Sequence, residues 1–240
     1  MKYVLIFILL LSFRAVSNTA SISLAVGHDH HKMLQQYRFY AASWEILTKE
    51  LTALGYQVNV KAYPWARAKD KVENTTHDGL FLAANFRGRE QWAVLSRAIG
   101  QDHFGIFNHR QSDNSKPIGS VRFSGNYSQI SFLAKDKQVK FATAQDGLKL
   151  LANKKLSGFI MSRSYGEYLL ANELKQIRNR IIFNDTRFEI HTAHIAISKK
   201  HPNVNVIQSL INSAIENAIE SGRYFQVMKK HDVDDYQLIK

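Results

Sequence analysis

Four adjacent residues, His28, Asp29, His30 and His31, have side chains that can bind a metal ion. Imidazole nitrogens and carboxylate oxygens are ordinary ligands of zinc, and imidazoles also bind copper. Adjacent residues in a turn rarely reach one ion, however, unless ligands from elsewhere in the chain join them. The sequence therefore offers His28, His30 and His31 only as a weak alternative, and the main prediction contains no metal site.

Catalytic motifs are missing from the sequence. The chain has no cysteine, which excludes thiol nucleophiles, disulfides and cysteine-ligated metal centres. It also has no Gly-x-Ser-x-Gly elbow, no His-Glu-x-x-His helix and no Gly-Lys-Ser/Thr phosphate loop. Carboxylates such as Asp29, Asp78 and Glu167 have no visible partner for acid–base work. The sequence thus predicts a binding protein without a cofactor, and not an enzyme.

Aromatic and amide side chains stand where strands are expected to end. Tyr63 and Trp65 flank Pro64 after one expected strand, and Asn85 and Phe86 follow another. Open α/β sheets bind ligands outside the carboxyl ends of their strands, where aromatic rings can stack on a ligand. The rings could instead pack between helix and sheet, and Asn85 could close a turn instead of contacting a ligand.

Short strands alternating with amphipathic helices must position these side chains. Residues 21–26 and 58–62 alternate between apolar and polar types, and a long amphipathic helix is expected between them at 33–54. A helix at 64–72 and a buried strand at 78–84 follow. This β-α-β-α-β order predicts an α/β protein with a parallel sheet covered by helices.

The second half of the chain continues the same alternation. Helix N-caps are expected at Thr143 and Ser164, and the clearest helix covers 206–219. No Pro/Gly-rich linker separates the halves, so the pattern predicts two lobes joined by strands. The expected strands of this half are 104–107, 121–123, 158–161, 181–183 and 190–197.

The N-terminus predicts export. Lys2 precedes an uncharged apolar run at 3–11, and the small residues Ala15 and Ser17 suit a signal-peptidase site. Because Arg14 ends the apolar run, the run is too short to span a membrane. We expect residues 1–17 to be removed and the protein to reside in the periplasm. The formal charge of +12 then falls by the two cations lost. Because the remaining charge is dispersed, nucleic-acid binding is not expected.

Several short motifs, taken in order, resemble the family 3 extracellular solute-binding proteins, which have the type II periplasmic binding-protein fold. Residues 144–160 are similar to that family's second-lobe helix and strand, and residues 202–224 to its closing helix. The remaining matching stretches are 63–68 (YPWARA), 78–79 (DG), 87–90 (RGRE) and 96–99 (SRAI).

The resemblance implies two lobes, each a mainly parallel sheet flanked by helices, joined by two crossover strands. Residues 18–108 and 196–240 would form lobe one, and residues 109–195 lobe two.

A ligand in contact with both lobes would favour their closed state, which an ABC-transporter permease or a sensor would recognise. We expect a monomer. A dehydratase-like enzyme or a metal-binding protein on the same scaffold, and a ligand-free signalling module, are the alternatives.

The resemblance also assigns ligand-binding residues in lobe one. Arg89 stands where the family's arginine holds the ligand carboxylate, a planar anion that matches the guanidinium fork. Arg67 and Arg87 are alternatives for that role. Asp29 follows the first strand, where the cleft opens. Tyr63, Trp65 and Asn85 complete the expected lobe-one contacts.

Lobe two would contribute the other side of the cleft. Asn126, Tyr127 and Ser128 stand where the family has a helix start, whose free N–H groups attract an anion. Ser162 and Arg163 replace the acidic residue that usually holds the ligand ammonium, and Ser162 is a candidate contact. A Leu-Ala-Ala sequence at 82–84 also replaces a serine-rich pattern. These departures predict a small anionic ligand, such as a carboxylate, that lacks an ammonium group.

Overall fold

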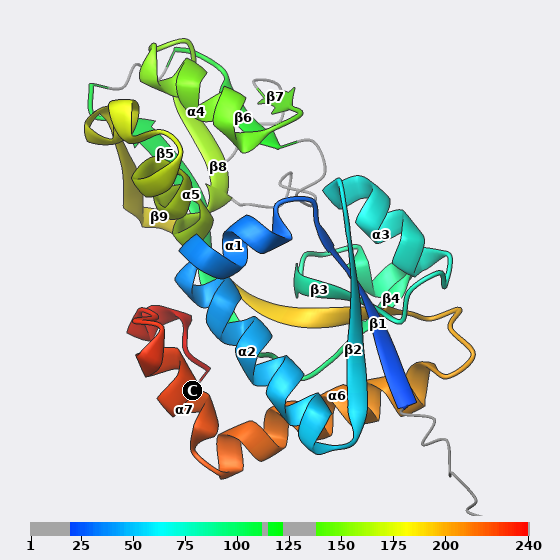
Figure 1. The fold of residues 1–240 in the computed structure, drawn as a ribbon. Helices are drawn as coiled ribbons and strands as arrows, with labels where there is room; N and C mark the ends of the chain where they lie inside the picture. Colours follow the sequence, from blue (N-terminus) through cyan, green and yellow to red (C-terminus); the bar gives the residue numbers. More distant parts are fainter. Residues whose placement is uncertain (1–19, 112–114, 122–137, 240) are drawn as a thin grey trace, which may run out of the picture.

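Two sets of strands and helices share one sheet in the computed structural model, which describes residues 20–111, 115–121 and 138–239 (Figure 1). We call the first set the first lobe. In it, β1 pairs in parallel with both β2 and β3. The elements of the first lobe are β1 (Ala20–Gly27), α1 (His30–Gln36), α2 (Arg38–Ala53), β2 (Tyr56–Tyr63), α3 (Trp65–Glu73), β3 (Gly79–Ala84), η1 (Arg89–Gln91) and β4 (Ala93–Leu95).

The second lobe repeats the arrangement on a smaller scale. Its central strand β6 pairs in parallel with β7 on one side and β8 on the other. The elements of the second lobe are β6 (Ile118–Val121), β7 (Gln138–Phe141), α4 (Ala144–Ala152), β8 (Gly158–Ser162), α5 (Arg163–Asn172) and η4 (Lys175–Arg180).

Two long strands, β5 (Gly100–His109) and β9 (Ile181–Ser198), connect the lobes. β9 pairs with β5 over 181–193 and then with β3 and β4, while β5 also pairs with β8. The result is one nine-stranded sheet in the order β2-β1-β3-β9-β5-β8-β6-β7, with β4 beside β9. This confirms the predicted two-lobed α/β fold with two crossover strands. The residue limits given above for each lobe stay a prediction.

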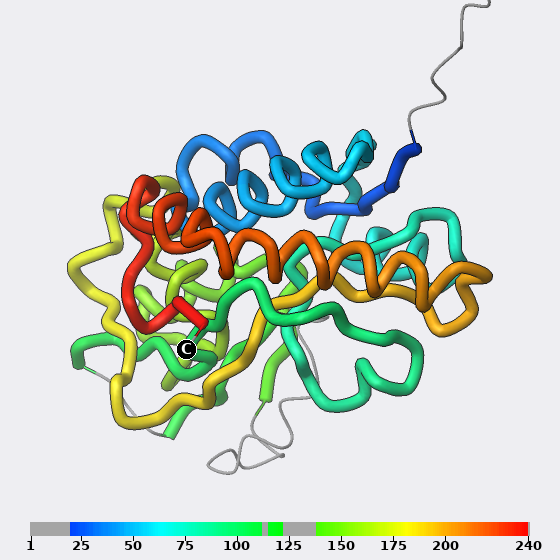
Figure 2. Tube along the Cα trace, turned by 90° about the horizontal axis from the view of Figure 1, so that it is seen from below, coloured from blue at the N-terminus to red at the C-terminus, as the bar shows by residue number. Residues whose placement is uncertain are grey.

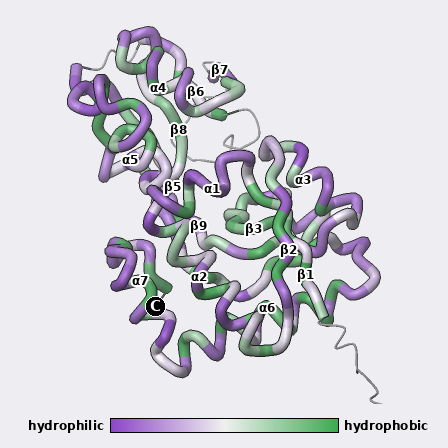
Figure 3. Tube along the Cα trace, viewed as in Figure 1, coloured by the Kyte–Doolittle hydropathy of each residue, from purple (hydrophilic) through white to green (hydrophobic). Residues whose placement is uncertain are grey.

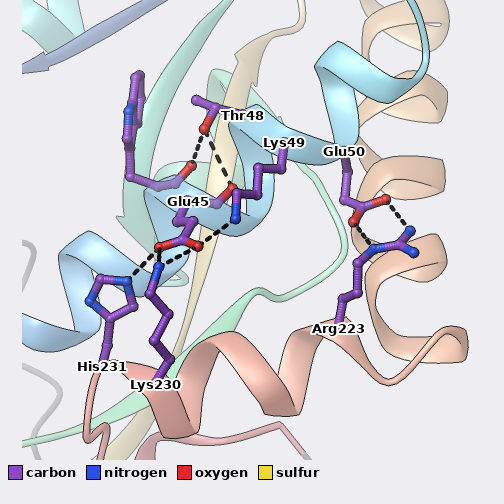
Figure 4. A network of polar contacts seen from close by, with 8 residues as sticks. Glu45, Thr48, Lys49, Glu50, Arg223, Lys230 and His231 are labelled. Carbon is purple, nitrogen blue, oxygen red and sulfur yellow. Dashed lines mark hydrogen bonds and ion pairs between the residues drawn. The ribbon is translucent and has the colours of Figure 1, made fainter.

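The C-terminal helices α6 (Val204–Glu220) and α7 (Arg223–Lys230) pack on α2, as the view in Figure 2 shows for α6, and η5 (Asp235–Gln237) packs on β5. Figure 4 shows the polar contacts between α2 and α7: Glu50 accepts two hydrogen bonds from Arg223, and Glu45 contacts Lys230 and His231. Although burial raises the pKa of Glu45, hydrogen bonds from these neighbours and Lys49 lower it to about 2. The chain thus ends against the first lobe.

Alternating side chains of β1 divide the core of the first lobe. Leu24 and Val26 belong to the cluster under α2 and α6, whereas Ala25 faces α3 through Ala68 and Val72. Figure 3 shows the hydrophobic stretches in the strands, β3 most clearly. This alternation is the pattern expected of a strand with helices on both faces.

The structure corrects several predicted elements. The helix predicted at 33–54 is broken at Tyr37, which is extended and separates α1 from α2. The strands predicted at 181–183 and 190–197 are one strand, β9, because it crosses both lobes. The N-cap of α5 is Ser162, whose hydroxyl accepts from Tyr165 N, and not Ser164. The predicted cap at Thr143 is confirmed.

Replacing Gly147 on α4 with alanine is expected to destabilise the protein by about 1–3 kcal/mol. A Cβ atom there would lie within 2.5 Å of Phe159 Cδ2 and Cζ, and Phe159 is fully buried. Alanine favours helix over glycine, so a loss of stability would come from this overlap and not from helix propensity.

Chemical denaturation of the single and double variants measures this effect. If the overlap is responsible, Gly147→Ala combined with Phe159→Leu loses less stability than the two single losses added together. Additive losses would contradict this explanation.

Candidate ligand-binding site

The carboxyl ends of β1, β2 and β3 lie together at the edge of the first lobe that faces the second lobe (Figure 1). Gly27 at the end of β1 pairs with Tyr63 at the end of β2, so the residues that follow these strands are neighbours. Ligands of open α/β sheets bind at such an edge. The predicted lobe-one residues are therefore brought to one region of the fold.

Arg89 begins η1 directly after Gly88, which has a left-handed backbone with φ of 91°. Its Nε donates to the carbonyl oxygen of Ala84 at 2.6 Å, at the end of β3. Burial lowers the pKa of Arg89 to about 10. No carboxylate of the described residues forms an ion pair with Arg89, and Glu90 instead accepts from Gly88 N. A desolvated guanidinium without a counter-charge favours binding of an anion.

The two aromatic residues beside Pro64 have structural contacts. Tyr63 hydroxyl lies 2.9 Å from His77 Nε2, and both Tyr63 and Trp65 pack against the apolar cluster beneath α3. Arg67 is exposed on α3. These contacts are those of rings packed between helix and sheet, and the partly buried rings stay predicted ligand contacts.

Asn85 ties the end of β3 to β9. Its Oδ1 accepts from Thr192 N at 3.1 Å and lies 3.0 Å from His191 Nδ1. Phe86 packs against Phe104 and His191. The side-chain oxygen of Asn85 is thus used within the fold, in a contact between strands and not in a turn, and its role as a ligand contact stays a prediction.

The histidines of the run differ in burial and contacts. His30 is 2% exposed, and its Nδ1 lies 2.7 Å from the hydroxyl of Tyr40. Burial, together with the nearby His31, lowers the pKa of His30 to about 4. His28 and His31 are exposed. Across the described residues, no three His, Asp or Glu side chains gather as a possible metal site.

Asp29 lies among tyrosines of both lobes, and its side chain is 16% exposed. The pKa values of Tyr40, Tyr165 and Tyr168 are raised first by burial, and the charge of Asp29 raises each further. Tyr165 and Tyr168 belong to α5, so this carboxylate of the first lobe faces the second lobe. A carboxylate surrounded by aromatic rings attracts a cation.

Further contacts join the lobes beside Asp29. Tyr37 stacks on Tyr168 with ring centroids 5.3 Å apart, and its hydroxyl lies 2.5 Å from Ser164 Oγ. Lys32 of α1 pairs with Glu173 at 2.7 Å. The break between α1 and α2 therefore places Tyr37 directly against α5.

Asp102 on β5 is a buried carboxyl group that the sequence did not single out. It accepts hydrogen bonds from Ser162 and Ser164 hydroxyls and from His103 N, and it is 8% exposed. Burial raises its pKa to about 6, against the opposing effect of these hydrogen bonds. The hydroxyl of Ser162 therefore donates to Asp102 and accepts from Tyr165 N at the start of α5.

The remaining predicted contacts, Asn126, Tyr127 and Ser128, lie outside the described residues, as does the predicted signal peptide. In the described ranges, no helix is both long and apolar enough to span a bilayer.

Comparisons with known proteins show what this chain resembles. No protein-family model matches the sequence, and no curated protein matches it. A histidine kinase sensor domain similar to periplasmic binding proteins shares 14% identity with a TM-score of 0.73, over 92% of this chain and 98% of the neighbour.

Two solute-binding proteins are also similar in structure. The first is a substrate-binding protein of an ABC uptake transporter from Streptococcus pneumoniae with bound histidine (15% identity, TM-score 0.69, 90% of this chain and 94% of the neighbour). The second is the arginine-, lysine-, histidine-binding protein ArtJ from Geobacillus stearothermophilus (14% identity, TM-score 0.67, 88% of this chain and 94% of the neighbour). The chain has the two-lobed periplasmic binding-protein fold of these neighbours.

Proposed function

We propose that this protein binds a free amino acid between its two lobes, which close over the ligand. The observation that carries the proposal is Arg89, a desolvated guanidinium without a carboxylate partner among the described residues, hydrogen-bonded to the end of β3 on the side of the second lobe. Its fork of donors would hold the ligand carboxylate. Supporting this class of ligand, the neighbours are named as binding histidine or arginine, lysine and histidine.

The amino-acid ligand replaces the ammonium-free anion expected from the sequence. That expectation rested on Ser162 and Arg163, which stand in place of an acidic residue after β8. The amino acids named for the neighbours do not support it. We propose that Asp29, with Tyr40 and Tyr165 around it, supplies the negative charge for the ammonium group.

The wider assignments follow the same proposal. The protein would be exported by residues 1–17 to the periplasm and act as a monomer without catalysis. Lobe one would comprise 18–108 and 196–240, and lobe two 109–195. Its partner would be a transporter permease or a sensor that recognises the closed state.

A thermal-shift screen tests this function. Ligands that bind only the native state stabilise it, by about 2.7 kcal/mol at 100 times the Kd. We expect a saturable rise in Tm with one or a few L-amino acids, unaffected by a metal chelator. No rise with any amino acid would contradict the proposal. A rise only with metal ions would favour the metal-binding alternative, and turnover of the added compound would favour the enzyme.

A further inference from the structure

A second candidate site lies at the outer end of the second lobe, away from the cleft. β5 starts beside Ala193, near the first lobe, and ends at His109 opposite Ile181. Beyond this end lies a cavity of about 390 Å³, formed by the ends of β5, α4 and η4. We call it the cationic cavity, because Arg110, Lys154 and Arg180 line it.

The three cations gather there without a carboxylate in the described lining. Some exposed cations elsewhere in the described chain pair with a carboxylate, as Arg97 does with Glu216 at 2.6 Å, whereas no described carboxylate pairs with these three. All three residues are exposed, so water screens much of the repulsion between their charges, and a bound anion would offset the rest. The arrangement therefore favours an anionic ligand.

Contacts within the fold hold the cationic cavity in shape. Arg110 donates from its backbone N to Arg180 O and from Nε to Asn179 O, both at 2.9 Å. Lys154 Nζ donates to Gln111 Oε1 at 2.7 Å. The guanidinium of Arg110 is thus fixed on one edge, and the charges come from three separate elements.

His109 adds a neutral donor to the same wall. Its Nδ1 accepts from Gln111 N at 3.0 Å, so the proton of the neutral ring resides on Nε2. Burial, and then the charges of Lys154 and Arg180, lower the pKa of His109. The positive potential of the cavity therefore acts on a neighbouring side chain.

Lys154 occupies a backbone position that favours glycine. It follows the C-cap of α4 and has φ of 56°, in the left-handed region. Glycine would fit this backbone conformation better than lysine does. The lysine found there places a positive charge at the cavity. This residue also gives a test variant that leaves the fold intact.

We propose that the cationic cavity binds a phosphate monoester or inorganic phosphate, either a soluble one or the monoester phosphate of a lipid headgroup. A phosphate monoester carries about 1.5 to 2 negative charges at neutral pH and several acceptor oxygens. Three cations from three separate parts of the chain, with the N–H donor of His109 next to Arg110, match that charge and shape better than they match one planar carboxylate. This site is independent of the proposed amino-acid site.

Calorimetric titration with inorganic phosphate at low ionic strength tests the proposal. The cavity variant is Lys154→Gly combined with Arg180→Gln, and the control is Lys199→Gln combined with Lys200→Gln, which removes two exposed charges after β9. We expect saturable binding to the wild type, at least tenfold weaker binding to the cavity variant, and less than a twofold change in the control. Amino-acid binding should be unchanged in both variants.

Sedimentation with vesicles distinguishes the two sources of phosphate. Binding to phosphatidic acid vesicles, whose headgroup is a phosphate monoester, but not to phosphatidylcholine vesicles, lost in the cavity variant, would assign a lipid headgroup. Phosphate binding without vesicle binding would assign a soluble ligand. Equal phosphate affinity in wild type and cavity variant, equal losses in cavity variant and control, or no binding in either experiment would overturn the proposal.

Discussion

Replacing Arg89 with alanine is expected to weaken amino-acid binding by roughly 10- to 150-fold, since a hydrogen bond to a charged group contributes about 1.5–3 kcal/mol. The guanidinium is desolvated and has no carboxylate partner among the described residues, so a bound carboxylate would supply its missing counter-charge. Calorimetry with the amino acid that gives the largest thermal shift measures the change.

Arg87→Ala is the matched control for this experiment. Arg87 lies two residues before Arg89 and is exposed. The control removes the same charge from the same loop. The affinity of Arg87→Ala for the amino acid should differ from that of the wild type by less than about twofold, as expected when a screened surface charge is lost. Equal losses for the two variants would show that general electrostatic attraction, and not a contact from Arg89, binds the ligand.

Asp102→Asn is expected to remove a pH-dependent contribution to stability. The pKa of Asp102 is raised from 3.8 to about 6 in the folded protein by burial. The folded state therefore holds this proton more tightly than the unfolded state. Its stabilising effect is fully present below about pH 4 and is lost as the pH rises through 6, a change on the order of 3 kcal/mol.

The measurement is the free energy of unfolding of wild type and Asp102→Asn between pH 4 and 7. Other groups titrate in this range, and His30, with its lowered pKa, acts in the opposite direction. Their contributions cancel in the difference between the free energies of unfolding of the two proteins. We expect the variant to gain stability relative to wild type as the pH rises. A difference that stays constant with pH would contradict a raised pKa at Asp102.

Local patterns predicted the fold class well because each depends on neighbouring residues. The alternation at 21–26 predicted β1, and Thr143 with Asp146 predicted the cap of α4. The family resemblance brought attention to Arg89. It did not reveal whether a carboxylate neutralises this residue, because that depends on residues distant in the chain.

The contacts between the lobes could not be predicted in the same way. Tyr37, Asp102 and Ser164 are more than 60 residues apart along the chain, yet they form one hydrogen-bonded group. Helical periodicity continues through Tyr37, so nothing local indicated the break there. Asp102 gave one weak signal, an acidic residue two positions before the apolar run at 104–107.

The central claim, that Arg89 holds the carboxylate of the bound amino acid, is tested most directly by changing both partners. The affinities of the amino acid and of the amine lacking its carboxylate are measured by calorimetry for wild type and Arg89→Ala. We predict that removing the carboxylate weakens binding at least tenfold in the wild type and less than twofold in the variant. The same loss in both proteins would contradict the claim.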